Sequence, residues 1–251
     1  MSIASSMDPI AIAAVSGLRS RMQSLDLLAN NIANTGTSGY KRDQEFYSLF
    51  SSEQAAGADG GEGATLPVVE RQWTDFSQGT LQVTGNPQDV ALDGKGFFMV
   101  NGPNGPLYTR NGSLQILPSG ELAVAGKYPL QNQSGGPILV TSGKPIQIST
   151  DGTVQQDGNT LGQIKVVNLP GTDSLQKVSD ACFQDQDPNN SPVNATGVEV
   201  QQGKIEQSNV PVAGAAMRLV EVMRQFEMLQ KAIGISGDMD TKAIQEVARV
   251  G

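Results

Sequence analysis

Apolar residues near the N-terminus recur at alternating spacings of four and three residues, which is typical of a helix that packs lengthwise against another helix. They are Ala11, Val15, Leu18, Met22, Leu25, Ala29 and Ile32. Asp8 and Pro9 supply an N-cap and a proline at the first helical position, and turn formers from Asn34 to Gly39 end the segment. The pattern predicts a helix from Asp8 to about Asn34.

A second seam of the same kind lies at the other end of the chain, after Pro211, with one polar intrusion. Its positions are Val212, Ala216, Leu219, Met223, Phe226, Gln230 and Ile233. Gly234 and Gly237 weaken this helix, each by about 1 kcal/mol relative to alanine. The sequence therefore leaves open whether the helix continues through Gly237 toward Val250.

Neither terminal helix can bury its apolar stripe alone, because isolated helices of this length are only marginally stable in water. We expect the two helices to pack together as a coiled-coil-like α domain and to use neighbouring subunits as further partners. We expect the methionine and leucine positions of the C-terminal helix to fill this interface rather than to line a ligand groove. The two ends should then be mobile in the free chain and ordered in an assembly.

Between the two ends the pattern changes to short β-like runs separated by glycine, which predicts a compact all-β domain. The runs are 96–100, 107–109, 114–116, 122–124, 145–148, 163–168 and 197–200. The predicted fold class is thus α+β. Its expected parts are an N-terminal helix at 1–34, an extended connecting segment with a Gly-rich linker at 35–80, a central β domain at 81–208 and a C-terminal helix at 209–251.

Composition argues against several classes of function. The chain has no histidine and a single cysteine, Cys182, so it lacks the usual neutral-pH general base, the usual zinc ligand and any intramolecular disulfide. All of the excess negative charge lies at 51–208, where sixteen acidic residues face eight basic ones, which disfavours nucleic acid. We predict no catalytic, cofactor or metal site and no small-molecule substrate. The start also lacks the pattern of a cleaved signal peptide.

Two local motifs suggest ligand sites but fail on their spacing. Gly94 and Gly96 flank Lys95, yet the Lys-Ser/Thr of a phosphate loop is missing and another predicted strand follows, so we expect a hairpin or bulge. The segment that starts at Asp185 begins like a calcium loop. It has Asn190 where glycine is needed and Thr196 where glutamate is needed, so we reject a calcium site.

Several short blocks of residues stand out in succession along the chain. At the N-terminal end they are Leu28 to Asn34 (LANNIAN) and Thr37 to Arg42 (TSGYKR). Further along they are 75–79 (DFSQG), 84–87 (TGNP), 89–98 (DVALDGKGFF), 108–113 (YTRNGS), 202–210 (QGKIEQSNV) and 224–227 (RQFE). These blocks resemble those of flagellar rod, hook and hook-associated axial proteins, and in particular the FlgF/FlgG rod family. They cover nearly the whole chain in the family's order, and a typical member begins close to Asp8, which makes Met7 an alternative start.

The resemblance implies a structural subunit of the flagellar basal-body rod rather than an enzyme. Such a subunit polymerises helically around the export channel in the periplasm-spanning rod, transmits torque for motility, and is exported by the flagellar type III apparatus without a cleaved signal. Its partners would be its own copies and the other proximal-rod and distal-rod proteins. The length and the 108–113 and 238–250 blocks favour the proximal-rod member FlgF, with a distal-rod FlgG-type or hook-related protein as the alternative.

Candidate assembly residues follow from the two seams and from the blocks at the end of the first helix. They are Ala11, Val15, Leu18, Met22, Leu25, Ala29, Asn30, Asn31, Ile32, Asn34, Gly39, Tyr40, Val212, Ala216, Leu219, Met223, Phe226 and Ile233. A peptidoglycan hydrolase would instead need paired carboxylates in a groove, and the sequence shows only scattered acidic residues. A polysaccharide-binding module would need several exposed aromatics, and Trp73 is the single tryptophan.

Overall fold

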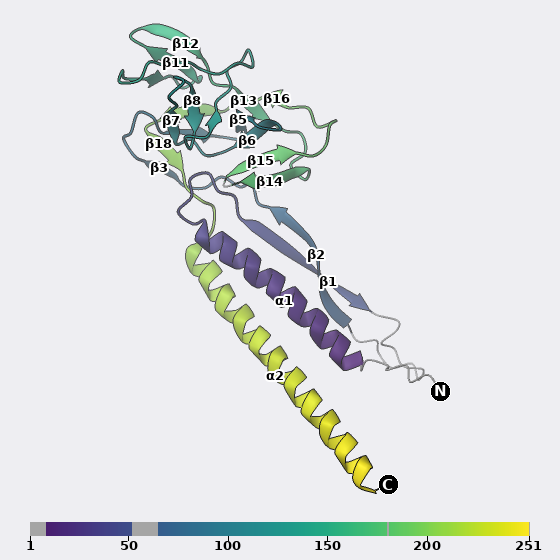
Figure 1. The fold of residues 1–251 in the computed structure, drawn as a ribbon. Coiled ribbons are helices and arrows are strands. Elements are labelled where there is room, and N and C mark those ends of the chain that lie inside the picture. Colours follow the sequence, from purple (N-terminus) through teal and green to yellow (C-terminus); the bar gives the residue numbers. More distant parts are fainter. Residues whose placement is uncertain (1–8, 52–64, 180, 251) are drawn as a thin grey trace. The chain divides into compact units, whose positions relative to one another are not determined.

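The computed structural model describes residues 9–51, 65–179 and 181–250, which form two helices and eighteen strands (Figure 1). Helix α1 (Pro9–Ala33) begins at the proline expected at its first turn, while Asp8, its expected N-cap, lies outside the described residues. Helix α2 (Val212–Val250) runs through both Gly234 and Gly237 without a break. The question that the sequence left open is thus decided in favour of one continuous helix.

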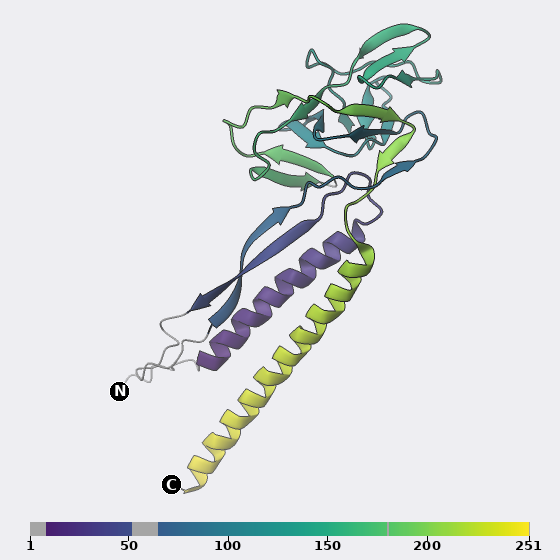
Figure 2. The ribbon, with the colours of Figure 1, turned by 180° about the vertical axis from the view of Figure 1, so that it is seen from behind.

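The chain divides into two compact units. The first, called the helix unit, contains α1, α2 and a two-stranded sheet of β1 (Asp43–Ser51) and β2 (Thr65–Thr74). Within this unit α1 lies between α2 and the β1–β2 pair, as seen from both sides in Figures 1 and 2. Strands β1 and β2 therefore belong with the helices.

The second unit, called the β unit, consists of residues 34–42 and 74–210. Its strands are β3 (Leu81–Val83), β4 (Val90–Asp93), β5 (Phe97–Gly102), β6 (Gly105–Thr109), β7 (Leu114–Ile116), β8 (Leu122–Val124), β9 (Tyr128–Pro129), β10 (Gln147–Ile148), β11 (Thr153–Gln156), β12 (Asn159–Gln163), β13 (Val166–Asn168), β14 (Leu175–Ser179), β15 (Cys182–Asp185), β16 (Val193–Asn194), β17 (Glu199–Gln202) and β18 (Lys204–Glu206). Several of them coincide with the runs predicted from the sequence.

The largest sheet of the β unit has the strand order β14-β15-β6-β5-β13-β16, and all of its pairings are antiparallel. Two three-stranded sheets, β7-β8-β9 and β10-β11-β12, and two strand pairs, β4–β17 and β3–β18, complete the unit. Gly94 and Gly96 lie in the bend between β4 and β5. These two strands belong to different sheets, so the bend is not a hairpin.

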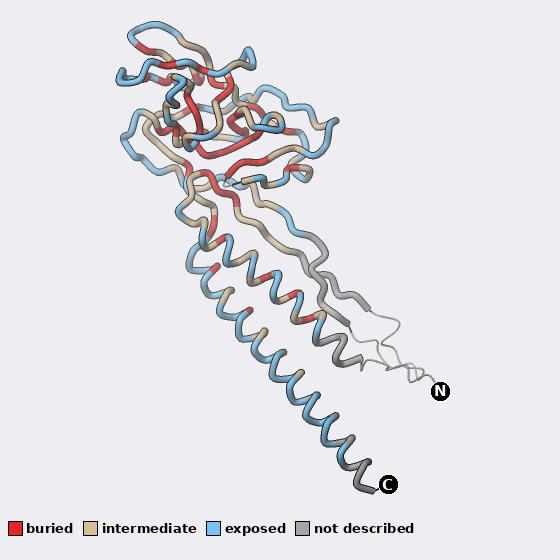
Figure 3. Tube along the Cα trace, viewed as in Figure 1, coloured by how far each residue is buried: buried red, intermediate tan, exposed pale blue. Residues whose placement is uncertain are grey.

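Strand β5 is buried on both faces because the β unit has two apolar cores. Phe98 and Val100 belong to the larger core, which also contains Leu92, Leu122 and Ile164, whereas the alternate residues Phe97 and Met99 belong to the smaller one. Side chains of a strand alternate between its faces. A continuous apolar run therefore marks a strand that is covered on both sides, and Figure 3 shows the buried residues concentrated in this unit.

The predicted fold class was wrong in its helical part. The expected coiled-coil-like domain of two helices is absent, because α1 and α2 share their unit with a two-stranded sheet and strands predominate among the described elements. Among the residues of α1 whose burial is described, the buried ones are Gly17, Ser20, Ser24 and Asn31 rather than the predicted apolar seam. Heptad spacing located an apolar stripe on each helix but not the neighbour that each stripe faces. The expected central β-rich domain is present.

The closest backbone approach to a glycine in the β unit gives a stability prediction. A Cβ atom at Gly112 would lie 1.6 Å from the carbonyl oxygen of Val90, whereas one at Gly36 would meet nothing within 4 Å. We expect Gly112→Ala to reduce the free energy of unfolding by more than about 2 kcal/mol, because the backbone of β4 must shift. Gly36→Ala, the matched control, should stay within about 0.5 kcal/mol of the parent in urea unfolding. Equal stability of the two variants would contradict the packing described here.

Candidate functional site

Within the helix unit, α1 faces its neighbours with small and polar residues. Gly17, Ser20, Ser24 and Asn31 are buried and share one face of the helix, at spacings of three, four and seven residues. A Cβ atom at Gly17 would lie 3.5 Å from Leu229 Cδ1, so this face meets α2 at close range. Small residues permit such a close approach of two helices, and they leave the large apolar side chains of α1 to other faces.

The predicted seam of α1 is therefore turned partly to solvent. Val15 is 59% exposed and Met22 is 58% exposed, and Ala29 is exposed as well. The alternate seam positions Leu18, Leu25 and Ile32 are half-buried, and the side chain of Ala11 lies outside the described residues. Half of this apolar stripe thus lies at the edge of the buried face and the other half points away from it.

Helix α2 shows the same division. Its buried face carries Ala215 and Val222, flanked by half-buried residues that include Leu219, Phe226 and Ile233 from the predicted seam. The other seam positions, Val212, Ala216 and Met223, are exposed. The expectation that the methionines of α2 fill an interface within the chain is wrong for the single subunit, since Met217, Met223, Met228 and Met239 are all exposed.

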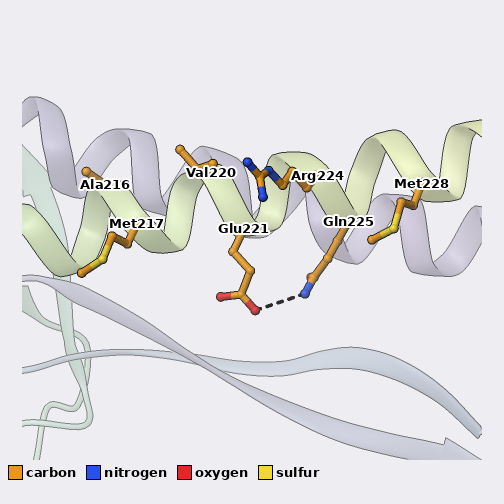
Figure 4. Close-up of a pocket in the computed structure, with 7 residues that line it drawn as sticks. All are labelled: Ala216, Met217, Val220, Glu221, Arg224, Gln225 and Met228. Atoms are coloured by element: carbon orange, nitrogen blue, oxygen red, sulfur yellow. Dashed lines mark hydrogen bonds between the residues drawn. The ribbon is translucent and has the colours of Figure 1, made fainter.

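An open groove of about 590 Å³ follows the exposed side of α2. Figure 4 shows the residues that line it, which are Ala216, Met217, Val220, Glu221, Arg224, Gln225 and Met228. Glu221 accepts a hydrogen bond from Gln225 Nε2 at 3.3 Å within the groove. The lining comes from one helix and combines the apolar residues Ala216, Met217, Val220 and Met228 with the polar residues Glu221, Arg224 and Gln225.

The asparagines at the end of α1 have distinct surroundings. Asn31 is buried and joins α1 to β1, because its Nδ2 donates to Asp43 O at 2.8 Å and its Oδ1 accepts from Asp43 N at 3.0 Å. Asn34, in the β unit, accepts a hydrogen bond from Thr37 Oγ1 at 3.1 Å. Asn30 is exposed. The run thus includes one asparagine that holds the helix unit together.

Gly39 and Tyr40 are both buried within the β unit. Gly39 has a φ of 69°, and a Cβ atom there would lie 2.2 Å from Asn111 N, so both its conformation and its surroundings require glycine. The ring of Tyr40 is covered on one side by Lys177, whose Nζ lies 4.1 Å from the ring centroid. These two predicted assembly residues anchor segment 37–42 to the β unit, and a role for them in contacts between subunits stays a prediction.

The next residue, Lys41, belongs to a fully buried ionic triad with Glu206 and Arg110. Lys41 Nζ lies 2.5 Å from Glu206 Oε1 and Arg110 Nη1 lies 3.1 Å from Glu206 Oε2, and the three side chains are at most 5% exposed. Burial lowers the pKa of Lys41 and that of Arg110, and the negative charge of Glu206 opposes both shifts. Glu206 also accepts a hydrogen bond from Gly79 N at 2.9 Å.

Sequence reasoning did not single out this triad. Its members lie 69 and 96 residues apart along the chain, and all three fall inside blocks that carried the family resemblance. A buried charge is rare unless it is paired. The residue types Lys, Arg and Glu therefore favoured solvent-exposed side chains at these positions. Only the resemblance marked these positions as special, and it did not reveal their partners.

Beside the triad, Arg42 and Asp75 connect two strand-like segments of the β unit. Arg42 Nη2 lies 2.9 Å from Asp75 Oδ2, and Asp75 N donates to Arg42 O at 2.9 Å. Partial burial tends to raise the pKa of Asp75, but hydrogen bonds from Ser77 and the Arg42 guanidinium outweigh burial and leave this pKa below its usual value. Asp75 therefore remains ionised at neutral pH and keeps its bond to Arg42.

The described residues offer little for other kinds of function. Among them, no three His, Cys, Asp or Glu side chains are grouped so that they could hold a metal ion. Within the same residues, neither helix combines the length and apolar character of a membrane-crossing segment. What the described residues do present is exposed apolar side chains on both helices and a β unit with a buried ionic triad.

Comparison with known families agrees with this reading. Residues 13–41 match the flagella basal body rod protein family, residues 91–156 match the flagellar hook protein FlgE/F/G D1 domain, and residues 201–246 match the flagellar basal body rod FlgEFG protein C-terminal region. FlgG of Buchnera aphidicola subsp. Acyrthosiphon pisum is 30% identical, over 91% of this chain and 96% of its own length. The chain belongs to the FlgF/FlgG family of flagellar basal-body rod proteins.

Other members of the FlgF/FlgG family are similar to a comparable degree. FlgF of Salmonella typhimurium is 30% identical over 86% of this chain and 89% of its own length. FlgF of Caulobacter vibrioides is 28% identical over 90% of this chain and 92% of its own length. FlgF and FlgG relatives thus match almost equally well. The resemblance inferred from the sequence is confirmed at the level of the family, while the choice between its two members is not decided by these similarities.

The triad leads to a stability prediction. Glu206→Gln keeps the size of the side chain but leaves two buried cations without their anion, so we expect a loss of about 3–5 kcal/mol in the free energy of unfolding. The matched control is Asp157→Asn, which removes the carboxylate of an ion pair with Lys144 whose side chains are 52% and 49% exposed. That change should cost less than about 1 kcal/mol. Urea unfolding followed by circular dichroism compares the two, and equal losses would contradict the proposed importance of burial.

Proposed function

We propose that this chain is a structural subunit of the bacterial flagellar basal-body rod whose copies join one another and other axial proteins through the exposed apolar faces of α1 and α2. The observation that carries the proposal is the row of large apolar side chains exposed on the helices of a chain that belongs to the FlgF/FlgG family. The proposed contacts are those predicted interface residues that are exposed in the subunit. They are Val15, Met22, Ala29, Asn30, Val212, Ala216 and Met223.

The exposure of α2 is costly for a free subunit. Met217 is 69% exposed, Met228 62%, Ile235 61% and Met239 66%. Apolar surface that leaves water contributes about 25 cal/mol per Å², so burial of these side chains between subunits favours assembly. Contiguous exposed apolar surface of this kind is typical of interaction sites.

The far end of α2 adds to this surface. Gly17 of α1 is level with Leu229 of α2, and the two helices run in opposite directions (Figure 1). Because both helices rise equally per residue, about the last 13 residues of α2 extend past the described part of α1. A neighbouring subunit is the natural cover for this part of the helix.

The finer features of the proposal rest on the family resemblance and on general rules of assembly. Contacts between unlike faces that do not close into a ring generate helical polymers, which suits a shaft around an export channel. Such a shaft would transmit torque along the periplasm-spanning rod, and type III export would deliver its subunits. We propose no catalytic role, since the family is one of structural rod proteins and the exposed faces consist of packing residues.

The position within the rod remains a choice between two structural roles. We favour the proximal rod, as in FlgF, on the length and the sequence blocks, and the alternative is a distal-rod FlgG-type or hook-related subunit. Crosslinking of the chain in intact basal bodies, followed by identification of its neighbours, separates the two. Neighbours drawn only from the distal rod and hook would exclude the favoured role.

A charge on the α2 face tests the proposed assembly surface. Met217→Lys alters a side chain of α2 that is 69% exposed. Its control, Val83→Lys, alters a side chain of the β unit that is 72% exposed. Neither should change the free energy of unfolding by more than about 0.5 kcal/mol. Each variant replaces the parental chain in the cell. We expect Met217→Lys to be missing from purified basal bodies and Val83→Lys to be present in them. Incorporation of Met217→Lys at the parental level would refute the surface assignment.

A further inference from the structure

The chain passes between its two units four times, after residues 33, 42, 73 and 210. The β-unit segments next to the last three of these crossings are 40–42, 74–77 and 206–210. All three segments are joined to one another inside the β unit by side chains that the proposed assembly surface does not use. We call Arg42, Asp75 and Asn209, together with their mutual hydrogen bonds, the clasp.

Asn209 is the central residue of the clasp. Its Oδ1 accepts a hydrogen bond from Arg42 N at 2.8 Å, while its Nδ2 donates to Asp75 O at 2.8 Å and to Ser77 O at 3.2 Å. One amide side chain thus binds the backbone of two other segments. The same side chain would be satisfied equally well by water, so the arrangement determines geometry more than net stability.

Arg42 and Asp75 close the clasp from the other side. Asp75 Oδ2 accepts a hydrogen bond from Arg42 Nε at 3.0 Å, and Asp75 Oδ1 accepts one from Ser77 N at 2.9 Å. The carboxylate therefore holds both the ion pair and the local turn. The side chains are 33% and 15% exposed. A partly exposed pair of this kind contributes little free energy on its own. Two nitrogens of Arg42, Nε and Nη2, nevertheless contact the same oxygen, Asp75 Oδ2, and Asp75 Oδ1 binds Ser77 N, so both segments are held at this carboxylate.

The clasp is attached directly to the buried triad. Lys41 Nζ donates to Ser77 O at 2.7 Å, and Gly39 N donates to Glu206 O at 2.7 Å. The triad therefore lies directly behind the clasp, and the clasp lies beside the three crossings after residues 42, 73 and 210.

We propose that the clasp is a stiffening device that fixes the directions in which three connecting segments leave the β unit. A single connecting strand can rotate about its φ and ψ angles, whereas three strands joined side by side rotate only if several hydrogen bonds break together. The proposal deepens the proposed structural function, on which its biological purpose rests. In a shaft that carries torque, a stiff connection passes rotation on instead of absorbing it in a swivelling linker.

The β unit offers a matched control for Asn209. Asn190 is likewise half-buried, and its side chain bridges two loops through Gly171 O at 2.6 Å, Gly171 N at 3.1 Å and Asp185 Oδ2 at 2.7 Å. None of these residues adjoins a crossing between the units. Asn190→Ala and Asn209→Ala thus remove equivalent bonding capacity, but only the second opens the clasp.

The test measures the stiffness of the connection in the full monomeric chain. Spin labels at Gln230→Cys in α2 and Val83→Cys in the β unit, both exposed positions, are placed in a Cys182→Ser background, and pulsed dipolar spectroscopy gives the distribution of distances between them. We expect Asn209→Ala to widen this distribution at least twofold and Asn190→Ala to leave it unchanged. Arg42→Ala, which removes the ion pair but keeps the backbone bonds, should give an intermediate width.

Three outcomes would overturn the proposal. They are a parental distribution as wide as that of Asn209→Ala, equal widening by Asn190→Ala, and parental widths in both Asn209→Ala and Arg42→Ala. Thermal unfolding of each labelled chain confirms that the β unit is folded, and Arg42→Ala decides the question if Asn209→Ala fails to fold. The measurement is made on monomers, so its result is separate from that of the Met217→Lys incorporation test.

Discussion

The burial of one carboxylate, Glu206, between two cations is the constraint on which the organisation of the β unit depends. Lys41 comes from the segment that follows α1, Arg110 from the end of β6 and Glu206 from β18, so the triad joins three distant stretches of chain at one point. A buried ion requires its partners in place, because the cost of removing it from water is recovered only by close, hydrogen-bonded geometry. The positions of Gly39, Tyr40 and the clasp follow from that requirement.

The two units differ in how they bury their apolar side chains. In the β unit two apolar cores cover both faces of β5, and the buried charges of Lys41, Arg110 and Glu206 are paired with one another. In the helix unit α1 uses Gly17, Ser20 and Ser24 toward the interior, and several of the largest apolar residues of both helices remain exposed. The largest exposed apolar side chains of the helix unit are therefore the ones available for the assembly contacts that we propose.

The helices and strands could be predicted from the sequence more readily than the neighbours against which they pack. Both helices, several strands and the β-rich centre could be predicted from periodicity and glycine spacing, because these are local properties of the chain. The heptad pattern on α1 was real, yet it did not indicate that Val15 and Met22 point outward, since periodicity defines a stripe and not its partner. The inward face at Gly17 and Ser24 carries no apolar signal that a pattern search would detect.

The sequence by itself determined the family, the two long terminal helices and the absence of histidine-based chemistry, because these depend on residue identity and short-range order. Only the tertiary structure decided that strands β1 and β2 belong to the same unit as the helices, that α2 is continuous through Gly237, and that Lys41, Arg110 and Glu206 meet. The physical reason is separation along the chain. Contacts between residues tens of positions apart depend on how whole elements pack, and no local pattern of side chains encodes that packing.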